Sequence, residues 1–353
     1  MPRGKSCVVI TGANGQDGSN MIDFLLESSA VDIIACVRRH STPQTKNIKH
    51  LFNNKRVIFE YLDLSDEASI ENVVEKYKPS YFLNFAANSF VAVSWKMPSH
   101  VMDVNALGVL RCLEAIKKHH PKCRFMNMGS SEEFGDVLFS PQTEDHPLRP
   151  RSPYGASKAA ARHLVKVYRE SYGIFAIQPW CFNHEGPRRG EDFVTRKITK
   201  NLCRIKEELE KGGIKETLKL GNLDSVRDWS DSRDIVSAIW EMVTQLNQPE
   251  DLIVCSENLK SVREFLLLAC KELWPQDEIK SEGFEHQEKI YINSNLMVEV
   301  SKEFYRPAEV DVLHGSMDKF KRFFPHWKPK FPMEEMIKNM LDNDYFEILQ
   351  NKT

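Results

Sequence analysis

The stretch VVITGANGQDGSNMIDFLLESS, residues 8–29, decides the expected fold. Its apolar run VVIT leads directly into a turn that holds Gly12, Gly15 and Gly18, and an amphipathic pattern follows. Taken alone, three glycines are also compatible with a purely structural turn. Between a strand and a helix, however, small residues let the backbone approach a pyrophosphate at the helix N-terminus. We therefore expect a dinucleotide-binding loop at this point.

The rest of the N-terminal half repeats this alternation of short apolar runs with amphipathic stretches. Such a pattern is typical of a parallel sheet wrapped by helices. We expect an α/β fold with a Rossmann-type doubly wound parallel sheet. The expected strands lie at residues 8–11, 33–37, 57–61, 81–85, 124–128 and 175–180, and the expected helices at residues 18–29, 67–78, 100–118 and 154–171.

After about Cys181 the alternation loosens, which indicates a smaller and less regular substrate lobe. We expect a cofactor domain at residues 1–181, which also carries the catalytic residues, and a substrate-binding lobe at residues 182–353. Some segments of that lobe are expected to return to the first domain. Its expected strands lie at residues 218–220, 252–255 and 298–300, and its expected helices at residues 230–245, 262–273 and 333–341.

Composition narrows the functional class. The 48 Lys and Arg residues nearly balance 50 Asp and Glu residues, which argues against a nucleic-acid partner. The eight cysteines form no CxxC pair and lie mostly in apolar runs, as reduced core thiols of a cytoplasmic protein do. The apolar stretch at residues 7–10 is far too short for a signal peptide or a membrane span. We expect no membrane partner and no metal site.

The cofactor is expected to be NADP. Twenty positions beyond Gly18, where an NAD enzyme usually offers a carboxylate to the ribose, the chain offers Arg38 and Arg39. A guanidinium suits a 2′-phosphate, although the pair is also compatible with a solvated surface. Asp63 is placed to accept a hydrogen bond from the adenine amino group, and residues 84–87 are expected to line the nicotinamide ribose.

A YxxxK pair supplies the candidate catalytic centre. Tyr154 and Lys158 lie four residues apart near the start of a helix and so share one face. An ammonium group beside a phenol lowers the phenol's pKa, so that a tyrosinate can take a proton from a sugar hydroxyl while hydride leaves for the nicotinamide. Ser130 would hydrogen-bond that hydroxyl, and Glu132 would lie beside the sugar as a base.

The carboxylate of Glu132 separates a dehydratase from a simple dehydrogenase or 4-epimerase. Once carbon 4 of a sugar is a ketone, the proton on carbon 5 becomes acidic and a carboxylate can remove it while water leaves carbon 6. The alternative is that Glu132 or Glu133 is a helix N-terminal charge, which explains Glu133 better than Glu132. An epimerase, a dehydratase of another nucleotide-sugar and a non-catalytic NADP-binding module remain competing interpretations.

These residues together resemble the GDP-mannose 4,6-dehydratases of the extended short-chain dehydrogenase/reductase type, whose glycine spacing is GxxGxxG. The resemblance rests on GQDGS, VRR, PRSPYGASK, NHEGPRRG, FVTRKI, LGNLDSVRDW, SVREF and YRPAEVD, between residues 15 and 311. It implies an NADP-dependent hydro-lyase that acts on GDP-mannose as a homodimer or homotetramer. The chain departs from the family at Ser130, Glu133, Phe134 and Phe90, where threonine, an aliphatic residue, tyrosine and a polar residue are usual.

The resemblance also implies binding residues, which fall into two groups. Those expected at the cofactor are Gly12, Asn14, Gly15, Gln16, Asp17, Gly18, Arg38, Asp63, Leu64, Ala86, Tyr154, Lys158, His184 and Arg189. Those expected at the nucleotide-sugar are Ser89, Ser131, Asn183, Lys197, Arg227, Arg306 and Glu309.

Overall fold

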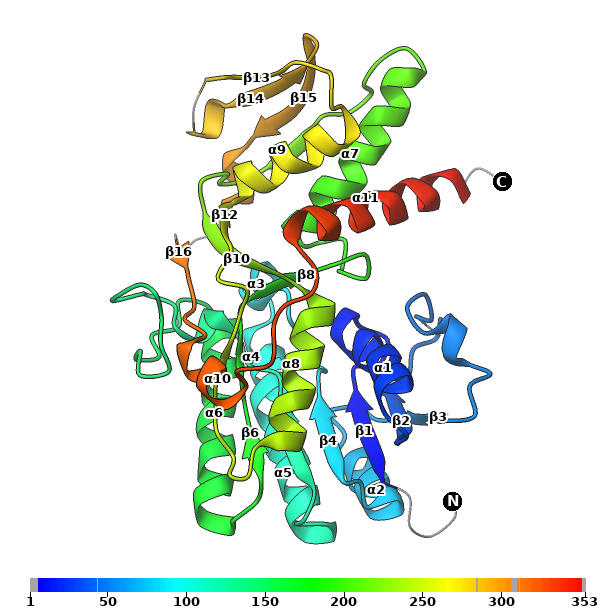
Figure 1. The fold of residues 1–353 in the computed structure, drawn as a ribbon, viewed down its shortest axis with the longest axis vertical. Coiled ribbons are helices and arrows are strands. Elements are labelled where there is room, and N and C mark those ends of the chain that lie inside the picture. Colours follow the sequence, from blue (N-terminus) through cyan, green and yellow to red (C-terminus); the bar gives the residue numbers. More distant parts are fainter. Residues whose placement is uncertain (1–5, 43, 284, 306–309, 311, 351–353) are drawn as a thin grey trace.

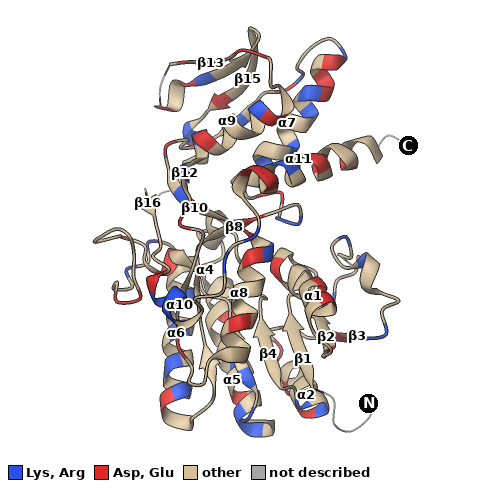
Figure 2. Cartoon of the chain, viewed as in Figure 1, with Lys and Arg blue, Asp and Glu red and all other residues tan. Residues whose placement is uncertain are grey.

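The computed structural model describes residues 6–42, 44–283, 285–305, 310 and 312–350. The chain forms a lower lobe around a parallel sheet and an upper lobe of helices and short strands (Figure 1). Acidic and basic residues are interspersed over both lobes (Figure 2), in keeping with the net charge of −2. Within the described residues, no helix combines the length and the apolar character needed to cross a membrane.

The sheet of the lower lobe has the strand order β3-β2-β1-β4-β5-β6, and all of its neighbouring strands are parallel. Side chains of β1 alternate between two hydrophobic cores, with Val8 and Ile10 on one face and Val9 on the other. Both faces are buried, which explains the continuous apolar runs. The strands are β1 (Cys7–Thr11), β2 (Asp32–Val37), β3 (Val57–Tyr61), β4 (Tyr81–Asn84), β5 (Arg124–Asn127) and β6 (Ala176–Ile177).

Helices cover both faces of this sheet. Helix α1 packs against α8 on one face, and α2, α5 and α6 pack together on the other. The expected α/β doubly wound fold is therefore confirmed. These helices are α1 (Gln16–Ser28), α2 (Glu67–Tyr77), α5 (Gly108–His119), α6 (Pro153–Tyr172) and α8 (Ser232–Gln245); α3 (Val91–Ser94) and α4 (Pro98–Met102) precede α5, and a wide helical turn (Asp103–Leu107) joins α4 to it.

Segments from the C-terminal half complete the lower lobe. Strand β7 (Trp180–Cys181) pairs in parallel with β11 (Ile253–Val254), and α10 (Asp318–Phe323) packs against β11. One hydrophobic core contains residues from Val8 as far as Phe324. The division into domains 1–181 and 182–353, with segments that return, stays a prediction.

The upper lobe has a separate core built by three helices and a small sheet. Helix α7 (Val194–Glu210) packs against α9 (Val262–Leu273) and α11 (Met333–Gln350), beside the sheet order β13-β14-β15-β9. Helix α11 extends well beyond the expected residues 333–341, and α7 and β13 were not expected. The sheet strands are β9 (Leu218–Leu220), β13 (Ile279–Glu282), β14 (Lys289–Ile292) and β15 (Asn295–Val300).

Strand β10 (Val226–Asp231) joins the two lobes. It pairs with β8 (Asn183–Glu185) and β16 (Val312–Leu313) in parallel and with β12 (Leu259–Ser261) in antiparallel orientation. Asp231 then caps α8, because its side chain accepts a hydrogen bond from the backbone N–H of Arg233. The strand thus carries the chain from the upper lobe down to α8.

Candidate active site

A cavity of about 540 Å³ lies where β1, β4 and β5 end. This position, beyond the carboxyl ends of parallel strands, is where open α/β sheets bind their ligands. The predicted site residues that line it are Gly12, Asn14, Gly15, Gln16, Asp17, Gly18, Arg38, Asp63, Leu64, Ala86, Ser89, Ser130, Ser131, Glu132, Tyr154, Lys158, Asn183, His184 and Arg189.

The glycine-rich turn brings the backbone close to the cavity floor. Gly12 has a φ of 63°, and a Cβ there would lie 2.9 Å from the backbone nitrogen of Ala86. A Cβ at Gly18 would lie 2.3 Å from the carbonyl oxygen of Gly12. Helix α1 begins at Gln16 without a side-chain cap, so its first N–H groups are available to an anion.

Gln16, Asp17 and His184 form a buried polar cluster on one wall. The Nε2 atom of Gln16 donates to Oδ1 of Asp17 and to the carbonyl oxygen of His184. Nε2 of His184 lies 3.1 Å from Oδ2 of Asp17. Burial alone would raise the pKa of Asp17 and lower that of His184, but the opposite charges overcome this, so that the pKa of Asp17 is lowered and that of His184 is raised.

Arg38 and Asp63 also line the cavity. Burial tends to raise the pKa of Asp63, but hydrogen bonds from Ser65 and the charge of Arg38 lower it overall. Arg38 lines the cavity and Arg39 does not. The loop that follows is tied to the glycine-rich turn, since the Nδ2 atom of Asn47 donates to the carbonyl oxygen of Asn14 over 3.1 Å.

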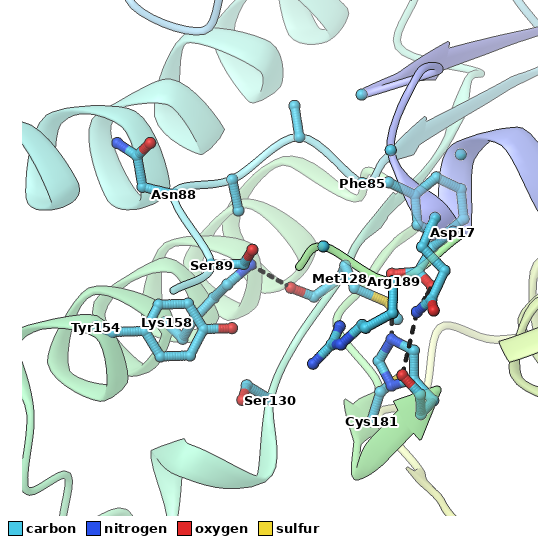
Figure 3. Close-up of a pocket in the computed structure, with 18 of the residues that line it drawn as sticks. Asp17, Phe85, Asn88, Ser89, Met128, Ser130, Tyr154, Lys158, Cys181 and Arg189 are labelled. Atoms are coloured by element: carbon cyan, nitrogen blue, oxygen red, sulfur yellow. Dashed lines mark hydrogen bonds and ion pairs between the residues drawn. The ribbon is translucent and has the colours of Figure 1, made fainter. Parts of the chain in front are cut away.

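Tyr154 and Lys158 lie side by side on α6 and face the cavity (Figure 3). The side chain of Ser152 caps this helix, and Pro153 occupies its first turn. Nζ of Lys158 donates to the carbonyl oxygen of Met128 over 2.7 Å, and it lies 6.0 Å from the centroid of the Tyr154 ring. The ammonium group of Lys158 is therefore held in place by the backbone that directly follows β5.

The pKa values of these two groups differ from the sequence-based expectation. Burial raises the pKa of Tyr154, and a hydrogen bond with Ser130 opposes this only in part. Burial also lowers the pKa of Lys158 to about 8. Burial therefore favours the neutral phenol of Tyr154 over the tyrosinate. A nearby positive charge, such as an oxidised nicotinamide, would favour the tyrosinate.

Ser130 and Glu132 also line the cavity, at the point where β5 leads into the short helix Ser131–Glu133. Oγ of Ser130 accepts a hydrogen bond from the backbone N–H of Glu132 over 3.2 Å. Glu132 is half-buried and lines the cavity, whereas Glu133 is fully buried and accepts from the backbone N–H of Ser130. The interpretation of Glu133 as a helix N-terminal charge agrees with this capping box.

Several residues predicted at the nucleotide-sugar lie apart from the cavity lining. Lys197, on α7, has its Nζ 3.8 Å from the centroid of the Phe304 ring, and Nη1 of Arg227, on β10, donates to the carbonyl oxygen of Val226. Arg306 and Glu309 lie outside the described residues. Of the predicted sugar contacts, Ser89, Ser131 and Asn183 line the cavity.

Phe193 is a cavity residue that was not predicted from the sequence. Phe193, the N-cap of α7, lines the cavity, and the guanidinium carbon of Arg189 lies 3.7 Å from the centroid of its ring. Phe90 contacts Phe193 edge to face, with 5.6 Å between centroids. For Phe193 the sequence signal was the aromatic residue that opens the FVTRKI motif. Phe85, within the predicted residues 84–87, also lines the cavity.

A family model described as GDP-mannose 4,6 dehydratase matches residues 9–340. The chain belongs to this family. It is 39% identical to GDP-mannose 4,6 dehydratase 1 of Arabidopsis thaliana over 96% of the chain and 90% of that protein. It is 35% identical to the GDP-mannose 4,6 dehydratase of Homo sapiens over 98% of the chain and 92% of that protein. The predicted family membership is confirmed.

Solved structures support the fold. A dTDP-glucose 4,6-dehydratase from Bacillus anthracis in complex with NAD has a TM-score of 0.79 at 22% identity, covering 98% of each chain. The structure of RMD from Pseudomonas aeruginosa complexed with NADPH has a TM-score of 0.76 at 20% identity, covering 97% of this chain and 100% of the other. At such identities the similarity concerns the fold alone.

Proposed function

We propose that this protein is an NADP-dependent hydro-lyase that converts GDP-mannose to GDP-4-dehydro-6-deoxymannose and water. The observation that carries the proposal is that the carboxylate of Glu132 lines the same cavity as Ser130, Tyr154 and Lys158. A dehydrogenase or 4-epimerase needs only the last three residues. A dehydratase needs a further base for the proton on carbon 5.

The cavity fits an anionic dinucleotide. The uncapped N-terminus of α1 offers backbone N–H groups, and Nη1 of Arg188 is buried at the lining without a hydrogen-bond partner among the described residues. Arg38 at the lining suits a 2′-phosphate, which favours NADP over NAD. When bound, NADP would take up a hydride from carbon 4 and return it at carbon 6.

The chain's own residues would then perform the proton transfers. Tyr154 accepts the proton of the carbon 4 hydroxyl, and Ser130 hydrogen-bonds the same oxygen. Lys158 supplies a positive charge beside the phenolate. Glu132 removes the proton from carbon 5 and passes it to the hydroxyl that leaves carbon 6 as water. Carbon 5 then regains a proton as hydride returns to carbon 6, and the proton that Tyr154 took from the carbon 4 hydroxyl balances this step.

Binding of the nucleotide-sugar is proposed to use both lobes. Ser89, Ser131 and Asn183 belong to the cavity itself. Lys197 and Arg227 are proposed to serve the diphosphate from the upper lobe, and Arg306 and Glu309 complete the predicted set. Burial lowers the pKa of Lys197, and an incoming phosphate would oppose that shift.

The test is incubation of the purified protein with GDP-mannose and without added NADPH. Mass spectrometry should detect a product lighter by one water. Glu132→Gln should abolish that loss, whereas Glu170→Gln, a change to an exposed carboxylate on α6, should not. Absence of water loss from GDP-mannose in the wild type would contradict the proposal, and a panel of other GDP-, UDP- and CDP-hexoses would then identify the nucleotide-sugar.

We also propose that the protein self-associates as a homodimer or homotetramer. Exposed apolar side chains gather along α3, α4 and the wide turn, where Val93, Trp95, Met97, Met102 and Leu107 are each at least 37% exposed. Sedimentation equilibrium would measure the mass, and a monomer at micromolar concentration would contradict this proposal.

A cytoplasmic location is proposed as well. All eight cysteines are buried and free, as expected in a reducing compartment. Fractionation of cells followed by immunoblotting tests this.

A further inference from the structure

Four parallel strands end in polar side chains that are hydrogen-bonded to one another across the sheet. Thr11, the last residue of β1, donates to Oδ1 of Asn84, the last residue of β4. Asn84 donates to Oδ1 of Asn127 at the end of β5 over 2.7 Å, and Asn127 donates to Oε1 of Gln178, just beyond β6, over 2.7 Å. All four side chains are at most 1% exposed. We call these residues the strand-end ladder.

The strand-end ladder finishes at Glu133. Nε2 of Gln178 donates to Oε1 of Glu133 over 3.1 Å and to the carbonyl oxygen of Lys158 over 2.9 Å. Oε1 of Glu133 also accepts from the backbone N–H of Ser130 over 2.9 Å. One carboxylate oxygen therefore connects the sheet to the backbone of the serine that faces the cavity.

A buried cation holds this carboxylate in place. Nε of Arg162 lies 2.5 Å from Oε2 of Glu133, and the two side chains are 7% and 0% exposed. Nη1 of Arg162 donates to the carbonyl oxygen of Gln178 over 2.6 Å, and the guanidinium carbon lies 3.4 Å from the centroid of the Trp180 ring. Arg162 lies one helical turn after Lys158 on α6.

The backbone before Ser130 is packed directly against the same guanidinium. A Cβ at Gly129 would lie 2.9 Å from Nη2 of Arg162 and 2.2 Å from the carbonyl oxygen of Pro179. The turn from β5 to the serine therefore has little freedom to shift. Its geometry relative to α6 is set by the ion pair and by the end of the strand-end ladder.

We propose that Glu133 and Arg162 are positioning residues for the oxidation step, which hold the Ser130 hydroxyl against the face of α6 that carries Tyr154 and Lys158. The inference rests on the proposed function, because oxidation at carbon 4 is the step that needs all three groups. A buried ion pair is weak evidence for stability by itself, since apolar replacements of similar volume are often equally stable. The positions of the pair, between Ser130 and the face of α6 that carries Lys158, are what argue for a positioning role.

Charge supports the same assignment. The negative charge of Glu133 acts to raise the pKa of both Tyr154 and Lys158, although burial is the largest influence on each. Removal of Glu133 thus changes both the placement and the electrostatic environment of the reacting groups. The charge of Glu132 also raises the pKa of Tyr154, but Glu133 alone of the two accepts from the backbone N–H of Ser130 and pairs with Arg162.

The experiment compares wild type, Glu133→Gln and the double variant Glu133→Leu/Arg162→Leu. The matched control is Asp136→Asn/Arg149→Gln, which removes an exposed ion pair beside the same loop. Melting temperature and NADP content are measured first, then kcat and KM for GDP-mannose, then the rate of NADPH formation in a single turnover by stopped-flow absorbance.

The double variant should fold and retain NADP, with kcat and NADPH formation about 100-fold slower and KM little changed, since small misplacements of reacting groups act on the transition state. Glu133→Gln should lie between it and wild type, and the control should match wild type. Wild-type kcat and NADPH formation in a folded double variant would overturn the inference. If the double variant does not fold, wild-type NADPH formation in Glu133→Gln would overturn it.

Failure of the proposed function is a separate outcome. If the wild type does not dehydrate GDP-mannose, the proposed function is contradicted. The positioning role of Glu133 and Arg162 can still be tested by a structure. The crystal structure of the double variant should then show the Oγ atom of Ser130 displaced relative to the hydroxyl of Tyr154. An unchanged arrangement would contradict the positioning role.

Discussion

Nε2 of His184 lies 3.1 Å from Oδ2 of Asp17 inside the cavity, although 167 residues separate the two in sequence. Asp17 is in the first turn of α1, directly after the glycine-rich turn, and His184 is on β8. The pair therefore connects the phosphate-binding end of the lower lobe to the strand that leads toward the upper lobe. Its charges make the stability of that connection dependent on pH.

The first prediction concerns this pH dependence. The raised pKa of His184 stabilises the fold fully below its ordinary value of 6.5, and this contribution is lost as pH rises through the raised value. The lowered pKa of Asp17 stabilises the fold above its ordinary value of 3.8, and this contribution is lost as pH falls through the lowered value. The unfolding free energy of wild type minus that of Asp17→Asn/His184→Gln should therefore be largest between these two ordinary values. Urea unfolding from about pH 4 to pH 9 measures it, and a difference that grows toward alkaline pH contradicts the prediction.

The second prediction is that the stability contributed by Lys158 changes with pH in the direction opposite to that of His184. Burial lowers its pKa to about 8 from the ordinary value of 10.5, so the unfolded chain binds more protons between these values and the stability contributed by this site rises with pH. Relative to Lys158→Met, wild type should gain roughly 3 kcal/mol in unfolding free energy between neutral pH and about pH 10.5. Lys166→Met, an exposed position on the same helix, serves as the control. A pH-independent difference would contradict the lowered pKa.

A third prediction compares two aspartates on α11. Asp344 is 0% exposed and accepts from Nε of the buried Arg196 over 2.7 Å, whereas Asp342 pairs with Lys338 on the surface. Asp344→Asn removes the fully buried carboxylate partner of Arg196 and leaves it the longer contact with Glu347 at 3.3 Å, so it should cost about 3 kcal/mol of unfolding free energy. Asp342→Asn should cost about 0–1 kcal/mol. Equal losses in denaturant unfolding would show that burial does not determine the contribution of this pair.

Cofactor choice supplies a fourth prediction. Arg38 lines the cavity and its neighbour Arg39 does not, although both were predicted as candidates from one motif. Arg38→Ala should weaken NADP binding about 10- to 100-fold while changing NAD binding little, because a charged hydrogen bond to a phosphate is worth about 1.5–3 kcal/mol. Arg39→Ala should leave the preference unchanged. Isothermal titration calorimetry with NADP and with NAD measures both affinities. An equal loss of affinity for the two dinucleotides would exclude a 2′-phosphate contact at Arg38.

The lower lobe was predictable because its strands are buried on both faces and so read as apolar runs. Helix α7 was missed because the segment 194–210 is rich in Lys, Arg and Glu, although its buried Ile198, Leu202 and Ile205 follow the spacing of an amphipathic helix. Strand β13 was missed for a similar reason, since its sequence IKSE is mostly exposed and gives no alternation.

Within the site, sequence predicted which residues gather but not how they interact. Asp17 and His184 were both named, yet nothing in a linear motif indicates that they form a pair. The motif around Tyr154 likewise gives no measure of burial, which determines the direction of its pKa. Lys197 stays a predicted substrate contact, and its Nζ lies over the ring of Phe304, a long-range contact that spacing alone does not encode.

The shared core of the lower lobe has a consequence for synthesis of the chain. Domains generally fold as units while they leave the ribosome, beginning with the N-terminal part. Here the face of the sheet beside α1 is covered by α8, and the same core includes Phe320 and Phe324. A nascent chain that has reached only residue 181 therefore leaves this apolar face uncovered. The lower lobe can therefore complete this core only after Phe324 has emerged.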